Sequence, residues 1–116
     1  MSEMAITYSI LGQGKRLRPL LCMETSKVFS VPNDVSIFCA IAIECIHTYS
    51  LVHDDLPSMD DDDLRRGQPT VHKKWNEATA VLVGDSLQSL SFEVLSDYQF
   101  KVSDKVKNKL ISISLI

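Results

Sequence analysis

The sequence predicts an all-α protein, because two long apolar segments read as helices and no run of residues indicates a strand. Residues 35–56 form the stronger segment, in which apolar side chains would cover almost every side of a helix. Residues 77–97 form the second, which combines an apolar face with many small residues that would let neighbouring helices approach closely. The chain has 116 residues, which is enough for one domain at most.

The composition is that of an ordinary globular protein, with 45% hydrophobic and 23% charged residues. The net charge of −3 gives no support for nucleic-acid binding. The cysteines, Cys22, Cys39 and Cys45, are odd in number and form no CxxC pair, which argues against a structural zinc site built from them. No signal-peptide pattern opens the chain, so we expect a cytoplasmic protein with reduced thiols.

The first basic cluster follows a short segment of weak helical spacing and two glycines, Gly12 and Gly14. Its members are Lys15, Arg16 and Arg18. Glycines allow the backbone to approach a ligand and the bases supply positive charge, so this stretch suits an anion. The alternative is a solvated basic turn that leads into a helix, with Pro19 in its first turn and residues 20–29 beyond it.

The segment at residues 35–56 is better explained as a buried central helix than as a membrane span. Asn33 or Asp34 would cap this helix. Its apolar content alone would also allow it to cross a membrane. Glu44 and His47 argue against a span, because a charged side chain in the middle of a membrane is costly. We therefore expect no stable membrane insertion.

The few polar side chains of this central helix fall on one stripe. They are Glu44, His47, Ser50 and Asp54. At about 1.5 Å per residue, His47 and Asp54 are about 10 Å apart along the axis, which is too far for a shared metal. That separation suits two neighbouring binding subsites in one cavity. The alternative for His47 is a core histidine whose hydrogen bonds are satisfied.

An acidic segment follows the central helix and is the most informative part of the chain. Residues 54–63 contain six aspartates, and Arg65 and Arg66 come directly behind them. Carboxylate oxygens are hard ligands that suit Mg²⁺ or Mn²⁺, and Mg²⁺ is commonly shared between carboxylates and substrate phosphates. Guanidinium groups bind phosphate oxygens in pairs. The segment therefore predicts a Mg²⁺–diphosphate site.

Asp54 and Asp60 are the two carboxylates that a turn can bring together. In an unbroken helix they would point about 120° apart. Pro57 removes a helical hydrogen bond and disfavours helix at the residue before it, so the segment can bulge and return Asp60 toward Asp54. We expect residues 61–63 to be capping, supporting or solvated aspartates, because six carboxylates cannot all face one site without cations.

The remaining residues are expected to add one long helix and the start of another. Residues 68–75 read as a turn and a short connection, in which His72 lies at the surface. Asn76 caps the helix at residues 77–97. Residues 105–116 begin a further amphipathic helix.

Three stretches stand out for the order and spacing of their residues, namely Gly14–Pro19, Glu44–Gly67 and the pair Gly84-Asp85. Together they resemble the trans-isoprenyl diphosphate synthase family. Within that family the resemblance is greatest to farnesyl diphosphate synthases of the bacterial type, and geranylgeranyl diphosphate synthases are related. It implies an all-α isoprenoid-synthase helical bundle, of which residues 1–116 form a single incomplete polyprenyl synthase domain.

The resemblance also implies roles for individual residues. Asp54 and Asp60 would bind Mg²⁺ and, together with Arg65, hold the diphosphate of an allylic substrate as the catalytic residues. Isopentenyl diphosphate would be bound by Lys15, Arg18, His47 and Arg66. Tyr49, shortly before the acidic segment, would limit the tail of the product and favour C15 over C20. The alternative for Tyr49 is a core tyrosine.

The implied activity is head-to-tail transfer of isopentenyl diphosphate onto dimethylallyl or geranyl diphosphate, giving farnesyl diphosphate. The chain is much shorter than members of the family and lacks their second aspartate-rich motif. We therefore expect it to be inactive alone, as a fragment or as one half of a split enzyme. It would form homo-oligomers or bind a partner chain that carries the second motif. The alternatives are a non-catalytic helical interaction module that retains a Mg²⁺–diphosphate site, and part of a geranylgeranyl diphosphate synthase.

Overall fold

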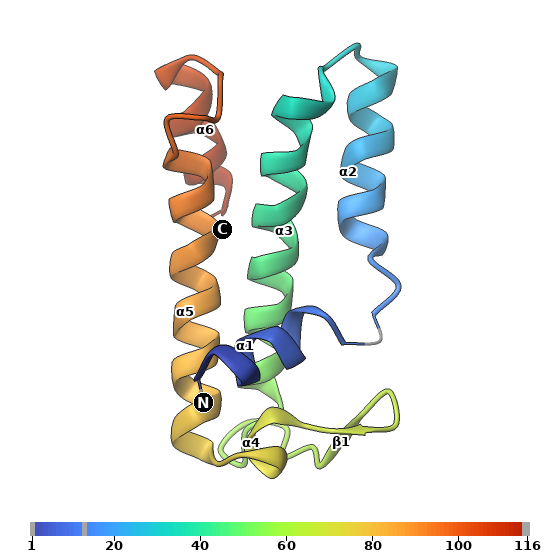
Figure 1. The fold of residues 1–116 in the computed structure, drawn as a ribbon, viewed down its shortest axis with the longest axis vertical. Helices are drawn as coiled ribbons and strands as arrows, with labels where there is room; N and C mark the ends of the chain where they lie inside the picture. The colour runs from blue at the N-terminus through green and yellow to red at the C-terminus, as the bar shows by residue number, and fades with distance from the viewer. Residues whose placement is uncertain (1, 13, 115–116) are drawn as a thin grey trace. The chain divides into compact units, whose positions relative to one another are not determined.

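The computed structural model describes residues 2–12 and 14–114, and it confirms the all-α class (Figure 1). The chain forms two compact units. Unit 1 consists of Met1–Lys15 and Cys45–Gln88, and unit 2 consists of Arg16–Glu44 and Ser89–Ile116. Two long helices, α3 (Asn33–Asp54) and α5 (Glu77–Ser96), contribute residues to both units.

In unit 2, α2 (Leu17–Val28) precedes the first part of α3, and α6 (Asp104–Ser114) follows the last part of α5. Figure 1 shows α2 alongside α3, to which a short turn connects it. Pro19 lies in the first turn of α2, as predicted, where its missing N–H interrupts no helical hydrogen bond. The helix α3 begins at Asn33, slightly before the predicted start at residue 35.

The hydrophobic core of unit 2 lies between α3, α5 and the segment that leads to α6. Its buried members are Ala42, Leu95 and Phe100. The ring of Phe38 stacks on that of Phe100 with the centroids 5.2 Å apart, a favourable separation for an aromatic pair. Ser91 is buried, and its Oγ donates a hydrogen bond of 2.9 Å to the carbonyl oxygen of Ala42. The small residues of α5 therefore permit close helix packing, as predicted.

Unit 1 contains the shorter elements. They are α1 (Ser2–Ile10), β1 (Leu64–Arg65), β2 (Gln68–Pro69) and α4 (Val71–Lys74). The helix α1 contacts α4. The hydroxyl of Tyr8 donates a hydrogen bond of 2.6 Å to the carbonyl oxygen of Pro69, and its ring meets that of Trp75 edge-on at 5.2 Å. Tyr8 thereby attaches α1 to the residues on either side of α4.

Gly84 allows α5 to lie against His53 of α3 within unit 1. The imidazole of His53 occupies the space that a β-carbon on Gly84 would take. The Nε2 atom of His53 lies 2.9 Å from the carbonyl oxygen of Val81 and 3.8 Å from a carboxylate oxygen of Asp85. A residue without a side chain is therefore needed at this point of close approach.

Several features differ from the expectations drawn from the sequence, and Asn33 and Asp34, expected as caps, are instead the first two residues of α3. The strands β1 and β2 form an antiparallel hairpin, which the sequence does not indicate because two-residue strands are too short to show alternation. The helix α3 ends at Asp54 rather than at residue 56, because Pro57 disfavours helix just before it. His72 is 7% exposed rather than at the surface, because it lies among the buried first residues of α4.

The other expected elements agree closely with the structure. The helix α5 ends at Ser96, one residue before the predicted end, and α6 begins at Asp104, one residue before the predicted start. Residues 115 and 116 of the predicted last helix lie outside the described residues. Cys22, Cys39 and Cys45 are free thiols in this structure.

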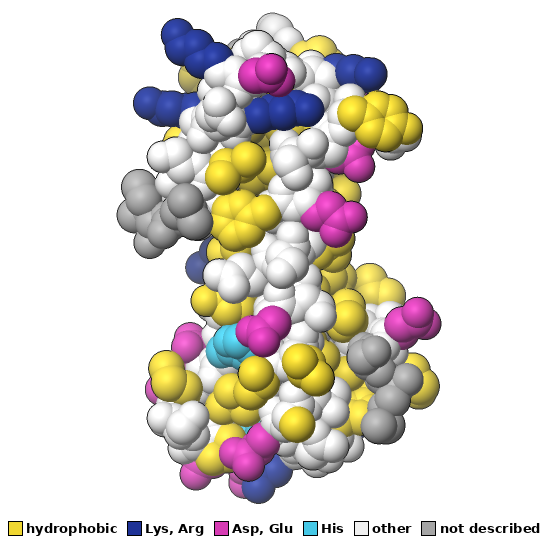
Figure 2. Space-filling model, turned by 90° about the vertical axis from the view of Figure 1, so that its left-hand side faces the viewer, with side chains coloured by type: hydrophobic (Ala, Val, Ile, Leu, Met, Phe, Trp, Pro, Cys, Tyr) yellow, Lys and Arg dark blue, Asp and Glu magenta, His cyan; other side chains and the backbone are white. Residues whose placement is uncertain are grey.

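Hydrophobic side chains reach the surface in both units, and Figure 2 shows them among charged side chains on one face of the molecule. Within the described residues, no side chain of α2 or of α6 is fully buried. Exposed apolar side chains around α2 include Leu17, Leu20, Leu21, Val28 and Phe29. Exposed apolar side chains that gather on one helix are typical of a face that packs against further protein.

Among the described helices, α3 alone is long and apolar enough to cross a membrane by length and composition. The core helices of water-soluble proteins meet the same criteria, so this finding is weak evidence for a span.

Candidate functional site

The acidic segment leaves α3 at Asp54 and turns back on itself. The backbone N–H of Asp60 donates a hydrogen bond of 2.8 Å to the carbonyl oxygen of Asp54. The N–H of Asp61 donates a second bond, of 3.0 Å, to the carbonyl oxygen of Leu56. These bonds close the bulge that Pro57 predicts, and they bring the backbone of Asp60 next to the end of α3.

Asp55 is the aspartate of the acidic segment that is buried and paired within the fold. Its side chain is 5% exposed, and its two carboxylate oxygens accept hydrogen bonds from Arg65, of 2.9 Å from Nε and 2.6 Å from Nη2. This two-point pairing, chiefly through its hydrogen bonds, raises the pKa of the Arg65 guanidinium. Arg65 is therefore held in one orientation on β1 as a permanent cation.

Sequence reasoning misses Asp55, although its position carries a signal. The buried residues of α3 in unit 1 recur at helical spacing, at Cys45, Thr48 and Val52. Asp55 continues this spacing just beyond the end of the helix. A charged side chain on a buried stripe needs an oppositely charged partner. Arg65 is the first basic residue after Asp55, and the hairpin that contains it can bring it back to Asp55.

Asp54 and Asp60 differ from Asp55 in having unpaired carboxylates. Asp54 is partly buried at the end of α3, and Asp60 is exposed. Within residues 2–12 and 14–114, neither side chain forms a hydrogen bond or an ion pair. Their oxygen lone pairs are therefore available to a cation.

The two arginines lie on the hairpin formed by β1 and β2. Arg65 is paired with Gln68 across the ladder, and Arg66 and Gly67 form the turn. Their φ angles of 51° and 78° have the positive sign that a type I′ turn requires at both central residues. Glycine adopts this conformation without strain, whereas arginine does not. Arg66 is therefore an exposed side chain on a strained backbone position.

The remaining predicted site residues of unit 1 lie on α3 or before α2. His47 is partly buried, and its backbone carbonyl accepts a hydrogen bond of 2.7 Å from the hydroxyl of Ser50. The ring of Tyr49 meets that of His53 edge-on at 5.2 Å. Lys15 is exposed. Ser50 thus bonds within its own helix, whereas the ammonium of Lys15 is accessible to a ligand.

Arg18 and Glu44 belong to unit 2. Glu44 accepts a hydrogen bond of 3.2 Å from Arg16. This polar residue of the central helix therefore forms an ion pair. Arg18 is exposed in the first turn of α2. It lines an open surface pocket together with Leu21, Cys22, Thr25, Ser26 and Ile43.

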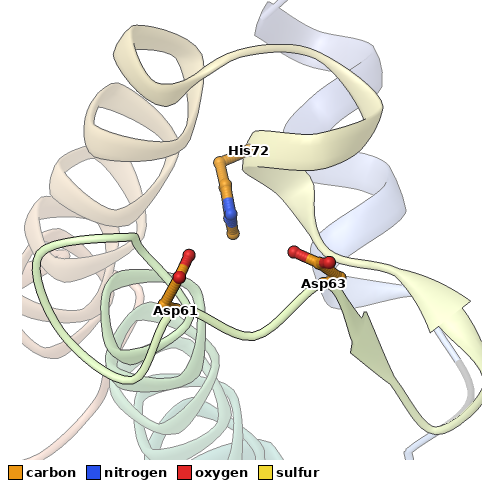
Figure 3. A group of neighbouring side chains, drawn as sticks. All are labelled: Asp61, Asp63 and His72. Atoms are coloured by element: carbon orange, nitrogen blue, oxygen red, sulfur yellow. The ribbon is translucent and has the colours of Figure 1, made fainter.

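A second group of side chains in unit 1 could hold a metal ion. Asp61, Asp63 and His72 each place one ligand atom within 4.8 Å of those of the other two. Figure 3 shows the imidazole of His72 pointing between the two carboxylates. Asp61 and Asp63 are exposed, which agrees with the prediction for them, whereas the surface position predicted for His72 is wrong.

The geometry around Asp54 suits a ligand that carries both a divalent cation and phosphate. The carboxylates of Asp54 and Asp60 can bind the cation. Arg65 has five N–H donors, of which Asp55 takes two, so others remain for phosphate oxygens. The pairing with Asp55 keeps these donors in place before a ligand arrives.

Comparison with known proteins places this geometry in context. The family described as polyprenyl synthetase matches residues 1–114. The chain is 54% identical to farnesyl diphosphate synthase of Escherichia coli over 106 residues, which are 90% of this chain and 36% of that protein. It is 53% identical to chloroplastic geranylgeranyl pyrophosphate synthase 7 of Arabidopsis thaliana over 92 residues, which are 79% of this chain and 26% of that protein.

The crystal structure of an FPP/GFPP synthase from Zymomonas mobilis matches with a TM-score of 0.91 and 50% identity, over 96% of this chain and 40% of that one. The predicted isoprenoid-synthase fold is thereby confirmed. The chain spans well under half the length of the relatives it matches.

Proposed function

The chain belongs to the polyprenyl synthetase family, and on that basis we propose that it forms the aspartate-rich part of a prenyltransferase site. In the proposed reaction, isopentenyl diphosphate is joined head to tail to dimethylallyl or geranyl diphosphate, giving farnesyl diphosphate. One observation supports this most strongly. Asp55 and Arg65 neutralise each other, while Asp54 and Asp60 keep carboxylates that no described residue pairs.

The residues at the end of α3 fit Mg²⁺. Asp54 and Asp60 offer hard oxygen ligands, and Mg²⁺ in proteins is usually bound by one or two carboxylates together with substrate phosphates. Bound at these residues, the ion would offset the charge that develops on a departing diphosphate.

Arg65 is proposed to hold the allylic diphosphate. Because Asp55 fixes the guanidinium, Arg65 has little conformational freedom left to lose on binding. Negative charge grows on the diphosphate as the allylic C–O bond breaks, so a fixed cation stabilises the transition state more than the bound substrate. Asp54, Asp60 and Arg65 are therefore the proposed catalytic residues.

Isopentenyl diphosphate is proposed to bind Lys15, Arg18, His47 and Arg66. Exposed basic side chains at three of these positions support the assignment. The double bond of isopentenyl diphosphate attacks the allylic cation, which forms the new C–C bond. The resulting cation then loses a proton to the departed diphosphate. An apolar cavity must keep water from both cations.

Tyr49 is proposed to limit the product to fifteen carbons. Its edge-on contact with His53 gives the ring a defined position on α3, which supports a role in closing a pocket for the prenyl tail. A geranylgeranyl product is the runner-up, because the relatives include geranylgeranyl pyrophosphate synthases at 53% identity.

The resemblance implies a second aspartate-rich motif for a complete site, and residues 1–116 do not contain one. We propose that another copy of the chain or a partner chain, the latter carrying that motif, covers the apolar side chains of α2 and α6. The absence of a fully buried side chain in either of these described helices supports such an association. The proposed activity is cytoplasmic.

Incorporation of radiolabelled isopentenyl diphosphate tests this proposal. The chain is assayed with geranyl diphosphate and Mg²⁺, alone and mixed with a polypeptide that carries the second aspartate-rich motif of a relative. Farnesyl diphosphate is expected from the mixture and not from either component. Efficient turnover by the chain alone would overturn the need for a partner. No product from the mixture, together with no Mg²⁺-dependent binding of geranyl diphosphate, would overturn the proposal itself.

A non-catalytic helical interaction module is the second candidate function, and the exposed apolar side chains favour it. This alternative would be favoured if Asp54→Asn left the association of the chain unchanged and no mixture formed farnesyl diphosphate. The enzymatic proposal requires that the same substitution weaken diphosphate binding.

A further inference from the structure

Three side chains around the hairpin of unit 1 have no part in the proposed prenyl transfer. Asp61 and Asp63 lie on the acidic segment before β1 and are exposed, whereas His72 lies in α4, after β2, and is 7% exposed. Their ligand atoms lie within 4.8 Å of one another. Figure 3 shows the imidazole of His72 between the two carboxylates. The hairpin thus brings together two acids and a buried base from separate segments.

Thr70 determines which ring nitrogen of His72 carries the proton. The single hydroxyl hydrogen of Thr70 is donated to the backbone, most closely to the carbonyl oxygen of Asp62 at 2.8 Å. The same Oγ1 lies 3.2 Å from Nδ1 of His72. Because the hydroxyl hydrogen is already used, Nδ1 must be the donor in this contact. The lone pair of the neutral imidazole is therefore on Nε2.

This lone pair is buried without a partner. Among the residues that the structure describes, none forms a hydrogen bond with Nε2 of His72. The carboxylates of Asp61 and Asp63 cannot supply one, since ionised carboxylates are acceptors only. A buried acceptor without a hydrogen-bond partner is destabilising, and a cation bound by the ring would satisfy it.

We propose that Asp61, Asp63 and His72 bind a Zn²⁺ ion at a site separate from Asp54 and Asp60. Zn²⁺ accepts imidazole nitrogen together with carboxylate oxygen, and three protein ligands leave a fourth position for water. Mg²⁺ prefers oxygen ligands alone and would favour the other pair of aspartates. The hydrogen bond from Nδ1 to Thr70 is of the kind that orients metal-binding histidines.

Small side-chain movements are enough to complete the coordination. Tetrahedral Zn²⁺ with bonds of about 2.1 Å places its ligand atoms about 3.4 Å apart. Asp61 and Asp63 are exposed, so their side chains can rotate inward while His72 stays in place. Lys73, whose Nζ lies 3.4 Å from the carboxylate of Asp63, can remain on the oxygen that the ion does not use.

The bound ion would join the two ends of the hairpin. Asp61 and Asp63 precede β1 and His72 follows β2, so a shared ion would limit the motion of Arg65 and Arg66 between them. Because the ion would bind the folded chain and not the unfolded one, it would also stabilise unit 1.

Titration of the metal-free full chain with Co²⁺, followed by competition with Zn²⁺, tests this proposal. Co²⁺ reports its ligands through its visible absorption spectrum. We expect one ion per chain, the spectrum of a four-coordinate nitrogen and oxygen site, and displacement by Zn²⁺ but not by excess Mg²⁺. A thiolate-to-cobalt charge-transfer band would overturn the proposal, because it would move the ion to a cysteine.

Asp61→Asn is the main variant, because Asp61 is exposed and the substitution keeps the shape of the side chain. Asp62→Asn removes the same charge one position away and is the matched control. We expect Asp61→Asn and His72→Gln to weaken binding at least about tenfold, and Asp62→Asn to change it less than about twofold. Equal weakening by Asp61→Asn and Asp62→Asn would overturn the site.

Asp54→Asn separates this proposal from the prenyl transfer proposed above. It is expected to remove Mg²⁺-dependent diphosphate binding and to leave Zn²⁺ binding intact. Loss of Zn²⁺ binding in this variant would overturn the separate site.

Discussion

The two halves of α3 contribute differently to the molecule. In unit 2, residues 33–44 place Phe38 and Ala42 in a core with Phe100, and these contacts are apolar. In unit 1, residues 45–54 lead directly into Asp55, whose charge is paired with Arg65. One half therefore stabilises a hydrophobic core, and the other positions a charged segment at its end.

This difference separates the expected effects of substitutions. Changes to the core of unit 2 should lower the free energy of unfolding by the amounts typical of lost apolar contacts. Changes to the charges of the proposed site in unit 1 should alter ligand binding, and should alter stability only where a charge is buried or its backbone is strained. The following predictions test this separation, from the largest expected effect to the smallest.

Phe100→Ala is expected to have the largest effect on stability. Phe100 is 1% exposed and stacks on Phe38, so its truncation should cost about 3–5 kcal/mol of unfolding free energy. Urea denaturation followed by circular dichroism measures this. Tyr98→Ala is the matched control, because Tyr98 is an aromatic residue of the same connection and is 77% exposed. Similar losses in both variants would contradict the assigned core.

Asp55→Asn should reduce both stability and diphosphate binding. It leaves the partly buried Arg65 without its anion, which should cost about 2 kcal/mol, because solvent can reach part of the guanidinium. Freed from Asp55, Arg65 should also bind an allylic diphosphate more weakly. Urea denaturation and calorimetric titration measure the two effects. Asp62→Asn, an exposed neighbour, should show neither, and a stable Asp55→Asn variant would refute the structural role of the pair.

Arg66→Gly is expected to stabilise the chain while weakening binding. Removing a non-glycine residue from the left-handed conformation should raise the free energy of unfolding by about 1 kcal/mol. The same change removes a cation proposed to hold isopentenyl diphosphate. Arg66→Asn is the control, since asparagine tolerates this conformation, and it should lose binding to the same extent. Full retention of binding in both variants would remove Arg66 from the site.

The smallest effect concerns alkaline pH and the thiols of unit 2. Burial raises the pKa of Cys22 and of Cys39, so in the folded chain both remain protonated to higher pH than the ordinary value of 9.0. Above 9.0 the unfolded chain loses these protons first, so stability should fall as the pH rises through the folded pKa values. Urea denaturation across this range should show a smaller fall in a Cys22→Ser/Cys39→Ser variant. An identical fall would assign the effect to other groups.

Periodicity was enough to predict the long helices, and the backbone restriction of Pro57 was enough to predict the turn. The apolar pattern of residues 35–56 corresponds to α3, and residues 77–97 correspond to α5. The small residues of α5 allow close packing, as the hydrogen bond from Ser91 to Ala42 shows. The return of Asp60 to Asp54 also follows from local rules, because proline restricts its own backbone and that of the residue before it.

The pairings within the acidic segment could not be predicted in the same way. Which aspartate is buried depends on where Arg65 lies, and that depends on a hairpin whose strands are too short to leave a pattern. The burial of His72 likewise depends on how a four-residue helix packs, and four residues contain no helical period. Local sequence rules describe one segment at a time, whereas these contacts join segments that only the fold brings together.

Calorimetric titration of the chain with geranyl diphosphate, with and without Mg²⁺, tests the central claim most directly. That claim assigns the metal–diphosphate site to Asp54 and Asp60, which the described residues leave unpaired. The account predicts binding that requires Mg²⁺ and is weakened at least about tenfold, or about 1.4 kcal/mol, by Asp54→Asn or by Asp60→Asn. Asp62→Asn should bind as the unaltered chain does. Binding that does not depend on Mg²⁺, or that neither substitution weakens, would contradict the account.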